Sequence, residues 1–225
     1  MNVAENLASI RENIEQACRK SGRDPQEVSV IAVTKYVSVE TANQAIQAGI
    51  KNIGENRKEG FLEKYNEIGS EATWHFIGTL QSRKVKDVIN QMDYLHSLDR
   101  LSLAKEVNKR APHKINCFVQ VNVSGEDSKH GINPEEVIPF VEKLGNYEQI
   151  EVSGLMTMAP HTENEDLLRG CFQNLRKLKE QIQDLRLSHA PCNYLSMGMS
   201  NDYSIAVEEG ATHIRIGTKL VGKEF

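Results

Sequence analysis

The chain has 225 residues, of which 39% are hydrophobic and 26% are charged, and its formal net charge is −4. This composition is typical of a soluble globular protein with one sizeable core, and (β/α) barrels of similar length often form a single domain. The slightly acidic balance argues against binding to nucleic acid or to an anionic membrane, because both need a basic surface.

The cysteines and the N-terminal segment indicate the compartment. The four cysteines at positions 18, 117, 171 and 192 are scattered and form no C-x-x-C pair. We therefore expect reduced thiols in a cytoplasmic protein, with neither disulfides nor a metal site. The first residues lack the basic and apolar regions of a signal peptide, and no apolar run approaches the ~18 residues that span a bilayer.

The hydrophobic pattern predicts eight strands that alternate with helices along the chain. A helix over residues 3–17 comes first, and Asn2 is expected to cap it and Gly22 to end it. The predicted strands follow at 29–34, 50–54, 74–78, 94–98, 115–123, 150–158, 194–197 and 212–216. Asp99 is the expected N-cap of the helix after the fourth strand, and the longest helix is predicted over 164–185.

This alternation predicts a parallel sheet. Eight βα units occupy residues 1–225 and leave no segment for a second domain, which favours a closed (β/α)₈ TIM barrel with an additional N-terminal helix. An open doubly wound sheet is the alternative. No G-x-G-x-x-G motif follows the first strand, which weighs against that alternative.

Lys35 stands at the end of the first predicted strand, after the β-branched run 29–34. A lysine at the mouth of an apolar strand is expected to be partly desolvated, which favours the neutral amine that can attack an aldehyde. The alternative is that Lys35 marks the strand end and points into water. This stretch alone does not decide between the two.

The ends of the last two predicted strands suggest an anion site. The loop 196–202 is rich in small residues and leads into a helix, whose first N–H groups attract anions. Alone, this loop is explained as a helix cap and a turn, but Arg215-Ile216-Gly217-Thr218 ends the next strand. Phosphate sites of (β/α)₈ enzymes commonly use these two loops. Arg215 could instead form a salt bridge to a neighbouring carboxylate.

A lysine amine and a phosphate site on opposite walls of one barrel mouth are what pyridoxal 5'-phosphate (PLP) requires. The chain resembles the pyridoxal phosphate homeostasis protein family, single-domain relatives of the alanine racemase barrel, essentially from end to end. The matching stretches are Ala32-Val33-Thr34-Lys35, Gly54-Glu55-Asn56-Arg57, Trp74-His75-Phe76-Ile77-Gly78-Thr79-Leu80-Gln81, Gly154-Leu155-Met156, Leu195-Ser196-Met197-Gly198-Met199-Ser200 and Arg215-Ile216-Gly217-Thr218.

The resemblance implies a role for each site residue. Lys35 would hold PLP as a covalent Schiff base, and Arg215 would face the pyridine nitrogen. The phosphate would be held by Ser200 and the amides of Gly217 and Thr218, and the pocket would be lined by Asn56, Ser196, Met197 and Met199. The role of His75 stays open, and a packing histidine is the more common case.

Two classes of function remain. A racemase needs proton donors on both faces of the cofactor, and Lys35 serves only one. In alanine racemases the other is a tyrosine brought by a second domain of the partner subunit, for which this chain has no residues. We therefore expect a non-catalytic PLP carrier that acts in intracellular PLP homeostasis and so affects amino-acid and keto-acid metabolism. Its partners would be apo PLP-dependent enzymes, and it would be a monomer. A PLP-dependent amino-acid racemase is the alternative.

Overall fold

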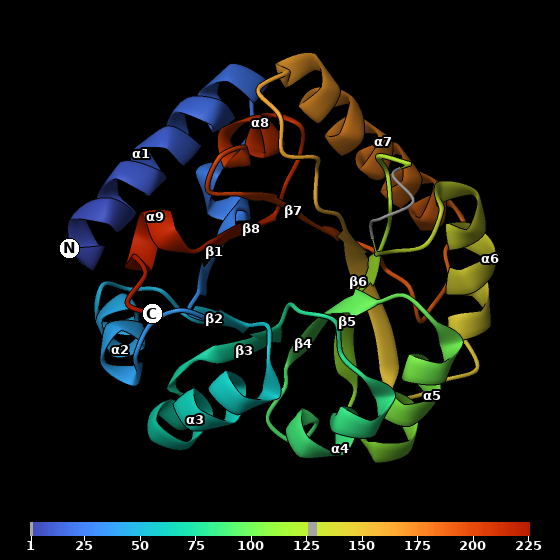
Figure 1. Cartoon of the computed structure of the whole chain (residues 1–225). Helices are drawn as coiled ribbons and strands as arrows, with labels where there is room; N and C mark the ends of the chain where they lie inside the picture. The colour runs from blue at the N-terminus through green and yellow to red at the C-terminus, as the bar shows by residue number, and fades with distance from the viewer. Residues whose placement is uncertain (1, 126–129) are drawn as a thin grey trace.

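Eight parallel strands form a closed barrel in which each strand pairs with its neighbour in sequence and β8 pairs with β1 (Figure 1). The computed structural model describes residues 2–125 and 130–225. The strands are β1 (Ser29–Val33), β2 (Asn52–Glu55), β3 (Thr73–Phe76), β4 (Tyr94–Leu98), β5 (Ile115–Gln120), β6 (Ile150–Met156), β7 (Tyr194–Met199) and β8 (His213–Ile216). The predicted closed barrel is confirmed, and the open sheet is excluded.

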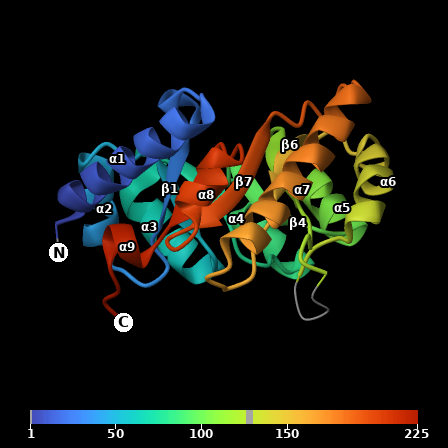
Figure 2. The ribbon, with the colours of Figure 1, turned by 90° about the horizontal axis from the view of Figure 1, so that it is seen from above.

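Helices surround the barrel, and α1 precedes the first strand as predicted (Figure 2). The helices are α1 (Val3–Ser21), α2 (Val39–Gln47), α3 (Lys58–Ile68), α4 (Val85–Val88), α5 (Leu101–Arg110), α6 (Pro134–Leu144), α7 (Glu165–Asp184), α8 (Tyr203–Glu208) and α9 (Thr218–Val221). Short 3₁₀ turns lie at Pro25–Glu27, Gly69–Glu71 and Ser82–Lys84. None of the helices in the described part of the chain combines the length and the apolarity needed to span a bilayer.

The predicted caps of α1 are confirmed, whereas the predicted cap of α5 is not. The Asn2 side chain accepts hydrogen bonds from the backbone N–H groups of Ala4 and Glu5, and Gly22 ends α1 with a φ of 68°. The prediction for Asp99 is wrong, because α5 begins one residue later and has Arg100 at its N-cap position. The Asp99 carboxylate is instead paired with the Arg100 guanidinium at 2.7 Å, so it cannot cap the helix.

Alternation along the strands divides buried side chains between two regions. Trp74 and Phe76 of β3 pack outward against Phe61 of α3, with ring centroids 5.4 and 5.9 Å away. His75 lies between them and is directed into the barrel, where it is hydrogen-bonded to His96 of β4. The apolar core therefore lies mainly between sheet and helices, whereas the barrel interior holds polar groups.

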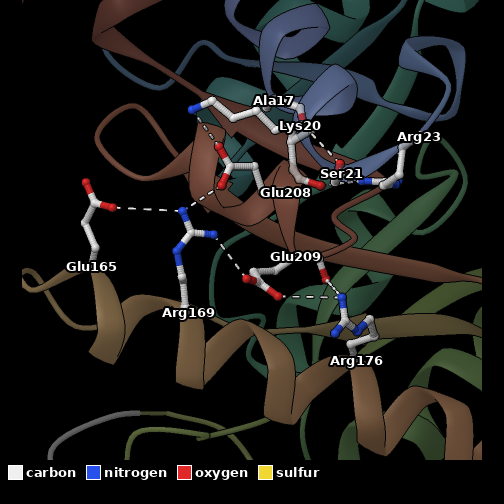
Figure 3. A network of polar contacts seen from close by, with 10 residues as sticks. Ala17, Lys20, Ser21, Arg23, Glu165, Arg169, Arg176, Glu208 and Glu209 are labelled. Atoms are coloured by element: carbon white, nitrogen blue, oxygen red, sulfur yellow. Dashed lines mark hydrogen bonds and ion pairs between the residues drawn. The ribbon is translucent and has the colours of Figure 1, made fainter.

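An ion-pair network joins α1 and α7 to the segment between β7 and β8 (Figure 3). Arg169 of α7 lies 2.6 Å from the Glu208 carboxylate and 3.1 Å from that of Glu209. Lys20 of α1 pairs with the same Glu208 at 3.2 Å. Burial alone would raise the pKa of Glu208, but hydrogen bonds from Arg169 and Lys20 bring it below its usual range. The network thus helps to hold the segment that leads into the last strand.

We predict that Arg169→Met lowers the free energy of unfolding by about 1–3 kcal/mol near neutral pH, because two largely buried carboxylates each lose one of their two cationic partners. A lowered carboxyl pKa stabilises the fold above the pKa of the unfolded chain, and this contribution is lost as the pH falls through the folded value. The difference between wild type and variant should therefore shrink in mild acid. Urea unfolding at about pH 7 and about pH 4 measures it.

Arg110→Met is the matched control for this experiment. Arg110 pairs with Glu106 at 2.7 Å on α5, but both side chains are about one-third exposed. Its loss should lower the free energy of unfolding much less than the loss of Arg169, because solvent screens an exposed pair. An equal effect of the two substitutions would show that the network at α8 stabilises the fold no more than an exposed ion pair does.

Candidate functional site

A cavity of about 470 Å³ opens at the carboxyl ends of the strands. It is where the barrel architecture places functional groups. The cavity is lined by most of the predicted site residues: Lys35, Asn56, Met199, Ser200, Arg215, Gly217 and Thr218. Lysine and arginine therefore share one cavity, as a site for a small anionic molecule with an aldehyde requires.

Lys35 lies two residues beyond the end of β1 and is exposed. The partial desolvation expected from the sequence is not found. Its Nζ lies 4.8 Å from the ring centroid of Tyr36, and no carboxylate in the described residues forms an ion pair with it. Since no salt bridge occupies the amine, it is available to a ligand in the cavity.

A buried ion pair anchors the backbone just before Lys35 and Asn56. Thr34 donates a hydrogen bond of 2.7 Å to the Glu55 carboxylate, and Lys64 of α3 lies 3.0 Å from the same oxygen. All three side chains are buried. The sequence alone did not indicate this role of Glu55, because the strand before it mixes apolar and polar residues. The pair fixes the starting points of two loops that line the cavity.

Gly78 allows the loops after β2 and β3 to meet at the cavity. A Cβ atom at this position would lie only 2.2 Å from the Asn56 carbonyl oxygen, which is backbone and cannot rotate away. The close approach keeps both Asn56 and Gly78 in the cavity wall. Any side chain at residue 78 would push the two loops apart.

The loop after β7 closes on itself through Asp202. The carboxylate of Asp202 accepts a hydrogen bond of 2.6 Å from the Met199 N–H, and its own N–H donates to the Met199 carbonyl. Burial raises the pKa of Asp202, although this N–H and the positive charge of Arg215 partly oppose the rise. Ser200 is held in this turn, at the wall of the cavity.

Arg215 is 5% exposed and has no carboxylate partner among the described residues. Its guanidinium donates one hydrogen bond to the Ser196 hydroxyl and another, of 2.9 Å, to the Thr157 carbonyl. Burial lowers its pKa to about 10, so the group is still a cation near neutral pH. The structural salt bridge weighed as an alternative is therefore absent from this part of the chain, and the charge faces the cavity.

Ser196 and Met197 were expected to line the pocket, but neither lines the cavity. Both are fully buried: Ser196 contacts Arg215, and Met197 belongs to the apolar core. Alternation along β7 directs Ser196 into the barrel interior, below the mouth, and Met197 to the opposite face, and the pairing register with β8 shifts only after Ser196. Ser196 therefore reaches the cavity only through the guanidinium that it holds.

Several polar residues line the cavity without having been predicted as site residues, among them Gln120, His161 and Asp202. Gln120 ends β5, and a polar residue at the end of an apolar strand could have indicated it. His161 lies in a loop whose path no local pattern predicts. Among the described residues, no cluster of histidine, cysteine or acidic side chains could hold a metal ion.

We predict that Glu55→Gln lowers the free energy of unfolding by about 3–5 kcal/mol, because the buried Lys64 ammonium loses its counter-charge. The double variant Glu55→Gln with Lys64→Met should recover much of this loss, since it removes the unpaired charge as well. Chemical denaturation of the two single variants and of the double variant measures the coupling energy between Glu55 and Lys64. Additive effects of the two substitutions would contradict the assignment of a buried pair.

The comparisons with known proteins agree with this geometry. Residues 6–224 match the family described as "Alanine racemase, N-terminal domain". The "Pyridoxal phosphate homeostasis protein" of Aquifex aeolicus is 40% identical over 99% of both chains. The protein of the same name from Escherichia coli is 33% identical over 98% of this chain and 96% of its own length.

Solved structures show the same relation. PipY of Synechococcus elongatus, solved with PLP bound, has a TM-score of 0.85 and 31% identity over 98% of this chain and 100% of its own. The alanine racemase of Corynebacterium glutamicum shares the fold, with a TM-score of 0.75 but 13% identity, over 97% of this chain and 60% of the enzyme. The chain therefore belongs to the alanine racemase N-terminal domain family and, within it, to the pyridoxal phosphate homeostasis proteins.

Proposed function

We propose that this protein binds PLP reversibly and acts in PLP homeostasis rather than in catalysis. One observation carries the proposal: an exposed lysine, without an ion pair to any described residue, and a buried arginine line the same cavity of about 470 Å³. The names of its relatives and the PLP bound to PipY support the same ligand.

In this proposal each predicted residue that lines the cavity has one task. PLP supplies an aldehyde that combines reversibly with a primary amine. Lys35 Nζ is the point of covalent attachment, and Arg215 donates a hydrogen bond to the ring nitrogen. The phosphate is held by Ser200 and by the backbone N–H groups of Gly217 and Thr218. Asn56 and Met199 form walls, and all seven residues line the cavity.

The acid–base groups near the cavity argue for a carrier rather than a racemase. A racemase needs a second acid–base group on the face opposite Lys35. Tyr203 is 2% exposed, and its hydroxyl accepts a hydrogen bond of 2.8 Å from Asn13, so it is not available to the cavity. Tyr36 is next to Lys35 in the chain and 41% exposed, so it is open to solvent rather than enclosed opposite the lysine. An arginine at the ring nitrogen also leaves that nitrogen unprotonated, which makes the ring a weaker electron sink.

The cellular setting follows from the same proposal. Apo PLP-dependent enzymes would be the recipients, and the protein would work as a monomer in the cytoplasm. All four cysteines are buried and none of them forms a disulfide, which suits a reducing compartment. Burial raises the pKa of the Cys117 thiol well above its ordinary value, so this cysteine is not a competing nucleophile.

We predict that borohydride reduction of the PLP-loaded protein labels Lys35. Peptide mapping should find the pyridoxyl group on this residue, and Lys35→Ala should lose both the label and the visible absorption of the bound cofactor. Lys223→Ala is the matched control, because Lys223 Nζ also lies near the Tyr36 ring, at 5.4 Å, but does not line the cavity. A label on Lys223, or none at all, would reject the assignment.

We also predict no steady turnover of amino acids. The loaded protein is incubated with a panel of L- and D-amino acids, and enantiomer conversion is followed by chiral chromatography against free PLP. A rate above free PLP that Lys35→Ala abolishes would establish the racemase alternative. A rate that survives this substitution comes from a contaminant or from free PLP.

A further inference from the structure

A chain of hydrogen bonds crosses the barrel interior from Arg215 to the opposite end. Arg215 donates to the Ser196 hydroxyl, which lies 2.8 Å from His96 Nδ1. His96 Nε2 lies 2.9 Å from His75 Nδ1, and His75 Nε2 lies 3.0 Å from the Asn52 side-chain oxygen. The five residues come from β8, β7, β4, β3 and β2, and the serine and both histidines are buried.

The chemistry of the two ends fixes the direction of every bond. A guanidinium can only donate, so the Ser196 oxygen accepts from Arg215 and its own proton is free to go to His96 Nδ1. His96 then carries its proton on Nε2 and donates to His75 Nδ1. His75 carries its proton on Nε2 and donates to the Asn52 oxygen, which can only accept. Each link has one donor and one acceptor when both histidines are neutral.

The surroundings favour the neutral rings. Burial lowers the pKa of both His75 and His96, and the positive charge of Arg215 lowers that of His96 further. His213 also faces this cluster, and burial lowers its pKa to about 4. Phe118 and Tyr94 supply the other nearby rings: Phe118 stacks on His96 at 4.3 Å and Tyr94 on His75 at 4.6 Å. None of these groups offers a negative charge that would stabilise an imidazolium.

We propose that His96, supported by His75 and Asn52, is a positioning residue that orients Arg215 through the Ser196 hydroxyl. By accepting the serine proton, His96 turns the serine lone pairs toward the guanidinium. The Thr157 carbonyl holds the other end of the guanidinium, so its remaining N–H groups are presented to the cavity in one orientation. This inference rests on the proposed function, in which those N–H groups meet the ring nitrogen of PLP.

The proton positions are testable in the protein without any ligand. In ¹⁵N-histidine-labelled protein near neutral pH, NMR should show His75 and His96 as neutral rings with the proton on Nε2. Loss of one set of signals in His96→Asn assigns the resonances. An Nδ1–H tautomer or an imidazolium at either residue would overturn the inference, and this result does not depend on whether PLP is the ligand.

Ligand binding tests the effect on Arg215. His96→Asn keeps an acceptor oxygen near the position of Nδ1. The leucine side chain of His96→Leu has nearly the same shape as that asparagine but has no acceptor. We expect His96→Leu to weaken PLP binding by about tenfold, the effect of a lost hydrogen bond to a charged group, and His96→Asn to stay within about threefold of wild type. An analogue of PLP with carbon in place of the ring nitrogen should bind both variants alike.

His213→Asn is the matched control, since His213 is buried in the same interior but bonds only to Thr212 among the described groups. It should leave PLP affinity unchanged. Equal losses for PLP and the analogue in His96→Leu, or equal losses in the Leu and Asn variants, would show a merely structural histidine. Failure of wild type to bind PLP rejects the proposed function, and the ligand-free tautomers still decide whether the chain of bonds exists.

Discussion

The pairing of β1 with β8 is the constraint on which the site depends. Ser29 pairs with His213 and Ala32 with Ile216, so the first and last strands lie side by side in parallel. Lys35 follows one of these strands, and Gly217 and Thr218 follow the other. A Cβ atom on Gly217 would lie 3.7 Å from that of Val33, which shows how close the two strand ends are. In an open sheet that lacked this pairing, the ends of the first and last strands would lie apart, and no small molecule could touch both.

The buried Arg215 is the second requirement of the architecture. A guanidinium inside a barrel is costly unless its N–H groups find acceptors. A carboxylate would satisfy it, but would also cancel the positive charge that attracts an anionic ligand. Neutral acceptors, the Ser196 hydroxyl and the Thr157 carbonyl, satisfy the group and leave its charge in place. These two polar groups of the interior therefore keep at the cavity a cation that forms no ion pair in the described part of the chain.

The two charged residues of the cavity differ in burial and in the contacts that hold them. Arg215 is buried and held at both ends, whereas Lys35 is exposed and forms no ion pair in the described part of the chain. In the proposed function, the fixed arginine would select the ligand, and the open amine would let other amines exchange with it. This division suits a protein that holds a reactive aldehyde and releases it again. Alanine racemases share the barrel, but fold alone does not transfer their catalysis.

The sequence by itself determined the order of eight strands, the extra helix α1 and its caps, because hydrophobic period and capping chemistry are local. It also predicted Lys35 and Arg215 as site residues, because functional groups of such barrels lie at the carboxyl ends of the strands. Only the tertiary structure decided that Lys35 is exposed and that Ser196 and Met197 lie behind the cavity. The contact of His75 with His96 and the pair of Glu55 with Lys64 are likewise tertiary. Each depends on strand register, a shift in β7 or the packing of a helix, and these arise between segments distant in the chain.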